Sequence, residues 1–235
     1  MLISYHNDKK IKAKYIKRVK NHRLADELIH GKGWDGTKGC AVGCTLEKYE
    51  HSAYETELGI PRAVARLEDV IFEGLPMAKS MLWPERFLKA VPVGADLTMI
   101  WPKFTLWILQ DVIQHAKPKG KLAIQTVILL FQRWLDGNKP SIDEFKKARA
   151  AADAADAADA YAADAADAAA AYAADAAAAA AAYAAAYAAA YDAAYAAAAY
   201  AADAAVYTAY AKHKFWLKAS DKLIELIKEC KPCAN

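Results

Sequence analysis

Residues 150–211 read AAADAADAADAYAADAADAAAAYAADAAAAAAAYAAAYAAAYDAAYAAAAYAADAAVYTAYA. Apart from Val206 and Thr208, this segment contains only Ala, Asp and Tyr, and it has no Gly, Pro, Lys or Arg. Ala has the highest helix propensity because its side chain loses no conformational entropy in a helix. The composition therefore predicts helix along the whole segment and an all-α fold class for the chain.

The length of this segment bears on the architecture. A single rod of its 62 residues would be about 93 Å long at 1.5 Å per residue. A compact chain of 235 residues has a radius of gyration of only about 18 Å. We therefore expect a helical bundle, in which the segment folds back into two or three long helices packed on a helical N-terminal body. The expected domains are a basic body over residues 1–140 and, over residues 141–235, the Ala/Asp/Tyr-rich helices with a C-terminal amphipathic helix.

The polar residues of the segment are periodic. Asp and Tyr recur at steps of eleven residues, close to three helical turns, in the sets Asp153, Asp164 and Asp175 and Tyr161, Tyr172 and Tyr183. One interpretation is that Asp faces water and Tyr packs on the rest of the protein. The alternative is that a Tyr stripe, with Tyr183 and Tyr187, lines a cleft and stacks on a planar ligand.

Charge is unevenly distributed. The chain has 31 Lys and Arg and 28 Asp and Glu, but residues 150–211 carry eight Asp and no base, a charge of −8. The other residues hold all 31 bases and the remaining 20 acids, which leaves +11. We expect the two parts to attract each other, with positive charge left for an anionic partner.

The remaining helices are expected from apolar periodicity and from Pro, Gly and capping residues. No stretch has the alternation of a strand. The expected helices are Asp8–His30, Leu46–Leu58, Pro61–Glu73, Met77–Val91, Leu97–His115, Ala123–Leu135, a helix started by the capping box of Ser141 and Glu144, and His213–Cys230.

A loop with five glycines, Gly31–Gly43, is the first candidate binding element. We expect Thr45 to cap the helix that follows, with Glu47 in its first turn. Backbone N–H groups before a helix N-terminus form an anion site, whereas the alternative is an ordinary Gly-rich turn. The residues expected to bind an anionic ligand are Lys32, Trp34, Lys38, Gly39, Gly43, Thr45, His51, Arg62, Arg66, Tyr183 and Tyr187.

Other residues leave weaker alternatives open. Cys40 and Cys44 would need two more ligands to bind zinc, and Cys44 would need His51 as a base to act as a nucleophile. Asp69 and Glu73, one helical turn apart, could hold a divalent metal or act in acid–base chemistry. Our expectation is small buried Cys, no bound metal, no cofactor and no catalytic residue.

Two resemblances to known protein families suggest the biological setting in which this protein acts. The pattern Trp134-Leu-Asp-Gly137, then Ser141, Ile142 and Glu144 before long Ala-rich helices, resembles the immunity protein family of bacterial toxin systems. Over about Met1 to Trp101 the chain resembles an uncharacterised family of bacteria and bacteriophages, through His6–Asp8, Gly39–Thr45, Glu57–Pro61, Ala65–Asp69 and Ile71–Gly74. This second resemblance implies no activity, and it implies a setting of conflict between phage and host.

These observations lead to one expected function and two alternatives. We expect a phage-type counter-defence protein that sequesters a small anionic, nucleotide-derived signalling molecule. It would otherwise bind another protein through its acidic Ala/Tyr face, or hydrolyse a nucleotide-derived ligand. We also expect a homo-oligomer, because an Ala-rich helix has little core of its own.

The setting is expected to be the cytoplasm, that of the host cell if the gene is phage-borne. Polar residues follow directly after Met1–Tyr5, so no signal peptide is predicted. No apolar run reaches the roughly 18 residues of a membrane span. The four Cys have no secretory context, which favours reduced thiols.

Overall fold

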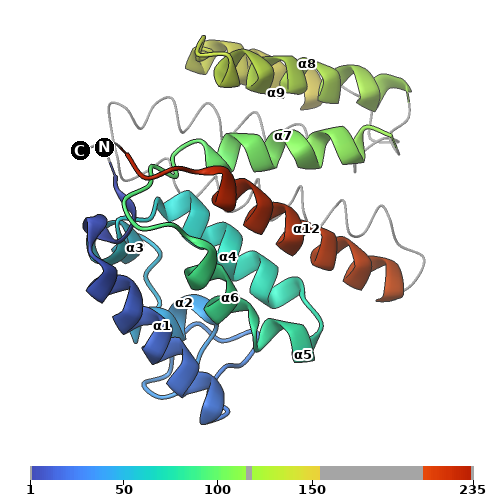
Figure 1. Ribbon diagram of the computed structural model, residues 1–235. Helices are drawn as coiled ribbons and strands as arrows, with labels where there is room; N and C mark the ends of the chain where they lie inside the picture. Colours follow the sequence, from blue (N-terminus) through green and yellow to red (C-terminus); the bar gives the residue numbers. More distant parts are fainter. Residues whose placement is uncertain (1, 115–117, 154–208, 234–235) are drawn as a thin grey trace. The chain divides into compact units, whose positions relative to one another are not determined.

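The structure is a computed structural model that describes residues 2–114, 118–153 and 209–233 (Figure 1). These residues are mostly helical and contain no sheet, only three isolated bridges, so the predicted all-α class is confirmed. Residues 154–208 lie outside the described residues, and with them the predicted fold-back and Tyr183 and Tyr187. No described helix is both long and apolar enough to cross a membrane.

The chain forms two compact units. Unit 1 comprises residues 1–100 and 216–235, and unit 2 comprises residues 101–215. The expected domain boundary at residue 140 falls inside unit 2, between two helices that pack on each other.

Unit 1 begins with a short 3-10 helix, η1 (Ser4–Asn7), and the basic helix α1 (Lys9–Leu24). The Asp8 carboxylate caps α1 by accepting the N–H of Lys10 at 2.7 Å, as expected of Asp before a helix. The helix was predicted to continue to His30, but it ends at Leu24 because Asp26 adopts a left-handed conformation with φ 53°. Tyr15 and Val19 form its buried face, and α1 contacts α2 and α6 (Figure 1).

Two short helices stand where the single helix Leu46–Leu58 was predicted, whereas the predicted helix Pro61–Glu73 is present. The helix α2 spans Ala41–Leu46 and starts after Cys40, so the prediction that Thr45 caps a helix is wrong. Thr45 is buried inside α2, and Glu47 closes this helix in a left-handed conformation instead of lying in a first turn. A turn then leads to α3 (Ala53–Leu58) and, after Pro61, to α4 (Arg62–Gly74), in which nine residues are buried.

The predicted helix Met77–Val91 is two helices, α5 (Met77–Ser80) and α6 (Trp83–Ala90). Pro84 lies in the first turn of α6, where a missing N–H costs no hydrogen bond. The last helix, α12 (Ala209–Glu229), enters unit 1 at Trp216. Its indole packs on Gly74, where an added Cβ would lie 2.2 Å from the ring.

Unit 2 contains α7 (Ile100–Val112), α8 (Pro118–Leu135) and α9 (Ile142–Asp153). An aromatic cluster joins them, with ring centroids 5.3–6.3 Å apart, formed by Trp101, Phe131, Trp134 and Phe145. The predicted capping box is present: the N–H of Glu144 donates to Ser141 Oγ at 3.3 Å and the N–H of Ser141 donates to Glu144 Oε2 at 2.8 Å. It starts α9.

Candidate ligand-binding site

The tip of the glycine loop binds one of its own carboxylates. Asp35 Oδ1 accepts the backbone N–H groups of Thr37 and Lys38 at 2.9 and 2.7 Å, and Asp35 Oδ2 accepts from the Lys32 ammonium at 2.7 Å. These contacts, that of Lys32 first, hold the pKa of Asp35 well below its usual range. The Asp35 carboxylate therefore occupies the Lys32 ammonium and the N–H of Lys38, two residues that were predicted to bind an anionic ligand.

The base of the loop is closely packed backbone. The N–H of Gly39 donates to the carbonyl of Glu27 at 3.0 Å. A Cβ on Gly43 would lie 1.8 Å from the carbonyl oxygen of Gly33, so only glycine fits there. With Thr45 fully buried, this part of the loop supports the packing of α2 on the chain before it.

The other predicted site residues are spread over unit 1. The Trp34 ring meets His22 edge-on, with centroids 5.5 Å apart. His51 follows α2 and donates a hydrogen bond to Asp69 of α4, at 3.0 Å from Nε2 to Oδ2. Arg62 and Arg66 are half-buried on α4.

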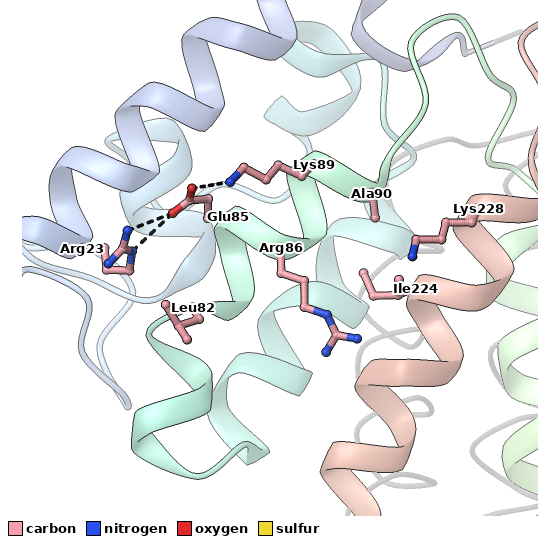
Figure 2. A pocket seen from close by; sticks show the side chains of 8 residues that line it. All are labelled: Arg23, Leu82, Glu85, Arg86, Lys89, Ala90, Ile224 and Lys228. Atoms are coloured by element: carbon pink, nitrogen blue, oxygen red, sulfur yellow. Dashed lines mark hydrogen bonds and ion pairs between the residues drawn. The ribbon is translucent and has the colours of Figure 1, made fainter.

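Unit 1 also has a pocket of about 510 Å³ to which α1, α6 and α12 contribute (Figure 2). Basic and apolar side chains and one carboxylate line it: Arg23, Leu82, Glu85, Arg86, Lys89, Ala90, Ile224 and Lys228. We call it the α1/α6/α12 pocket. None of its residues was predicted to bind a ligand, because they come from segments far apart in the sequence.

The pocket is positive. Glu85 lies between Arg23 and Lys89, with N···O distances of 3.1 and 2.7 Å (Figure 2). The hydrogen bond from Lys89, and after it that from Arg23, lowers the pKa of Glu85 against its partial burial. Arg86 pairs with Asp221 at 2.6 Å, and both side chains of this pair are largely exposed. Four cations therefore face two carboxylates.

An apolar wall completes the pocket. Three lining residues are apolar: Leu82, which is half exposed at the start of α6, Ala90 at the end of α6, and Ile224 of α12 (Figure 2). The Arg86 guanidinium also lies over the Trp83 ring, 5.9 Å from its centroid. The pocket thus offers charge for an anion and an apolar surface for the rest of a ligand.

A second basic hollow of about 580 Å³ lies along α1. Its residues are Lys14, Lys17, Arg18, Asn21, His22, Ala25, Glu27 and Glu47. Its carboxylates are engaged by neighbours, since His22 contacts Glu27 at 2.5 Å and Arg18 contacts Glu47 at 3.2 Å. It lacks an apolar wall like that of the α1/α6/α12 pocket.

A buried polar cluster lies between α2 and α4. Ligand atoms of Cys40, Asp69 and Glu73 are all within 4.8 Å of one another. Burial, and then the charge of Asp69, raises the pKa of the Cys40 thiol far above its usual value. Burial also raises the pKa of Glu73 to about 7, although the N–H of Gly31 opposes that shift. The spacing of Asp69 and Glu73 is visible in the sequence, but the approach of Cys40 is not.

Comparison with known proteins gives no further guide to this site. The chain matches no model of a known protein family, and neither the curated proteins nor the solved structures contain a significant match.

Proposed function

We propose that this protein binds a small anionic, nucleotide-derived ligand and that the α1/α6/α12 pocket holds it. The observation that supports this most is the convergence of Arg23, Arg86, Lys89 and Lys228 on one pocket that also has an apolar wall. Its volume, about 510 Å³, lies within the range of small-molecule sites.

The chemistry of the pocket suits a phosphate-bearing ligand. Guanidinium and ammonium groups donate charge-assisted hydrogen bonds to phosphate oxygens. The ion pair of Arg86 with Asp221 is exposed, and such pairs contribute less than about 1 kcal/mol, so a phosphate would displace Asp221 readily.

The apolar wall and Glu85 favour a ligand with a heterocycle and a sugar. A ring would cover Leu82 and Ile224, while Glu85 would accept a hydrogen bond from a hydroxyl or amino group. Inorganic phosphate would use only the cations and would bind more weakly.

In the setting implied by the resemblance of residues 1–101 to a bacterial and bacteriophage family, such binding would sequester a host immune signal. Sequestration returns the ligand chemically unchanged. A hydrolase would instead release products, and a protein that acts through its acidic face would leave small molecules alone.

The test is ligand recovery. The purified protein is incubated with cyclic dinucleotides and ADP-ribose derivatives, and both the free and the heat-released molecules are analysed by mass spectrometry. We expect one of these probes to be depleted and recovered intact only after heating. Cleaved probe would contradict sequestration and support an enzyme, and no depletion would contradict binding and support a protein partner.

Two charge-matched double variants locate the site. Arg86→Gln/Lys228→Gln removes two cations from the pocket, whereas Lys9→Gln/Lys10→Gln removes two exposed cations from the first turn of α1, outside both hollows. We expect at least tenfold weaker binding of the retained probe, about 1.4 kcal/mol, only in the pocket variant. Equal loss in both variants would indicate a general effect of charge and would contradict the assignment to this pocket.

A further inference from the structure

We propose that Cys40, Asp69 and Glu73 form a binding site for one divalent transition-metal ion of the Zn²⁺ type. The site joins two elements of unit 1: Cys40 precedes α2, and Asp69 and Glu73 lie one turn apart on the same face of α4. Their sulfur and carboxylate oxygen atoms lie within 4.8 Å of one another, and a metal ion with bonds of about 2.0–2.3 Å would draw them closer together.

The orientation of Asp69 is the second observation. Its side chain is 3% exposed, and Oδ2 accepts hydrogen bonds from His51 Nε2 at 3.0 Å and from the Tyr49 hydroxyl at 3.2 Å. Its other oxygen, Oδ1, is buried and has no hydrogen-bond partner in the described part of the chain. A buried carboxylate oxygen without a partner is costly, and a cation bound there would remove that cost.

The other two ligands are held in the same manner. The N–H of Gly31 donates to Glu73 Oε2 at 2.8 Å, which fixes that carboxylate and leaves Oε1 for a metal. At Cys40, the backbone N–H groups of Gly43 and Val42 oppose the rise in the pKa of the thiol that burial and the charge of Asp69 cause. Hydrogen bonds of this outer kind orient ligands in metal sites, so the glycine loop serves here to position Glu73 and Cys40.

The ligand set selects the class of metal. A thiolate with two carboxylates suits Zn²⁺, Co²⁺ or Fe²⁺, because soft sulfur disfavours Mg²⁺ and Ca²⁺. Three protein ligands leave a fourth position of a tetrahedron for water or another small ligand. The three anionic groups exceed the charge of a divalent ion by one, and the hydrogen bond from His51 Nε2 to Asp69 Oδ2 at 3.0 Å offsets part of the charge on that carboxylate.

The test uses Co²⁺, whose bond to a thiolate gives a charge-transfer band in the near ultraviolet. Cys230 and Cys233 are accessible thiols that would bind metal by themselves, so both are replaced by Ser in the reference protein. After treatment with a chelator and dialysis against Co²⁺, we expect one bound ion per chain and the thiolate band. Absence of bound ion or of the band in this reference protein would overturn the proposal.

A matched pair of cysteine variants identifies the sulfur ligand. Cys40→Ser should abolish the band, whereas Cys44→Ser should keep it, although both thiols are buried and flank the same turn of α2. Cys44 instead donates to the carbonyls of Glu27 and Gly39. A band that persists in Cys40→Ser, or that disappears only in Cys44→Ser, would contradict the assignment.

Two further variants keep the proposal testable if Cys40→Ser does not fold, which circular dichroism would reveal. Glu73→Gln retains an oxygen for the N–H of Gly31 but loses the anionic ligand, and we expect it to lower Co²⁺ affinity more than 100-fold. His51→Ala removes the hydrogen bond that orients the Asp69 carboxylate, and it should lower the affinity for Co²⁺ about 10- to 100-fold. Unchanged affinity in Glu73→Gln would overturn the site.

Discussion

Arg23 of α1 donates two hydrogen bonds to a single oxygen of Glu85 in α6, at 3.3 Å from Nε and 3.1 Å from Nη2. Lys89, one turn further along α6, donates to the other oxygen at 2.7 Å. Glu85 is 12% exposed in its side chain and thereby joins the basic helix to the wall of the α1/α6/α12 pocket.

The first prediction concerns acid stability. The pKa of Glu85 is lowered in the folded state, whereas an unfolded Glu has a pKa of about 4.3. Between these values the unfolded state binds more protons, so this contribution is present above pH of about 4.3 and is lost as the pH falls through the folded pKa. Glu85→Gln should remove the contribution and lower the free energy of unfolding at pH 7 by about 1 kcal/mol.

Urea unfolding at pH 7 and at pH 3 measures this effect. The difference between wild type and Glu85→Gln should shrink at the lower pH. Glu50→Gln, which alters an exposed carboxylate, is the control and should change stability little. A deficit of Glu85→Gln that is as large at pH 3 as at pH 7 would show that lost packing, and not charge, is responsible.

The second prediction is that the same substitution tightens anion binding. Neutralising Glu85 leaves Arg23 and Lys89 without their anionic partner in the pocket. We expect affinity for pyrophosphate, measured by calorimetry at low salt, to rise several-fold in Glu85→Gln and the gain to shrink at high salt. Weaker binding would mean that Glu85 positions the two cations instead of competing for them.

Parts of the fold were predictable because their causes are local. Asp8 caps α1 and Ser141 pairs with Glu144, and both patterns lie within four residues of sequence. The Thr45 cap failed because the chain already turns into helix at Cys40, whose N–H donates to the carbonyls of Lys32 and Gly33. Contacts of this kind depend on how the loop folds back, and the glycine pattern does not encode them.

The two candidate sites show the same difference between features set by nearby residues and features set by contacts between distant parts of the chain. Asp69 and Glu73 are one turn apart, so a shared face followed from helical spacing. The approach of Cys40 and the hydrogen bond from His51 require α2 and the following turn to pack on α4. In the α1/α6/α12 pocket, Arg23 and Lys228 are separated by nearly the whole chain, and no local pattern could have paired them.

The third prediction tests the contact between α4 and α12. An added methyl at Gly74 would lie 2.2 Å from the Trp216 ring, so Gly74→Ala must displace the indole. Overpacking of this kind costs about 1–3 kcal/mol. Urea unfolding should show this loss, and Gly74→Ala in a Trp216→Leu background should cost less, since the smaller side chain makes room. If Gly74→Ala costs the same free energy of unfolding in both backgrounds, its effect does not arise from a clash with the Trp216 ring.

The fourth prediction concerns a buried pair in the core of unit 1. The Tyr54 hydroxyl donates to Glu68 Oε2 at 2.6 Å, and both residues are fully buried. Tyr54→Phe removes a donor from a buried carboxyl group and should destabilise the protein by about 1–3 kcal/mol. Glu68→Gln keeps an acceptor for Tyr54 and should cost less. The reverse order in urea unfolding would mean that the carboxyl group of Glu68 has another stabilising role.

The fifth prediction is confined to unit 2, where Ser141 caps α9. Its Oγ accepts the N–H of Glu144, and without it the first turn of the helix loses a hydrogen bond. Ser141→Ala should therefore destabilise unit 2 by about 1 kcal/mol, whereas Ser141→Asp, which also caps, should retain stability. Hydrogen exchange of the amides in α9 measures this locally, because a lost cap frays the first turn before it affects unit 1. Equal protection of the α9 amides in Ser141→Ala and Ser141→Asp would show that Arg133, which contacts Glu144 at 2.5 Å, holds the start of the helix instead.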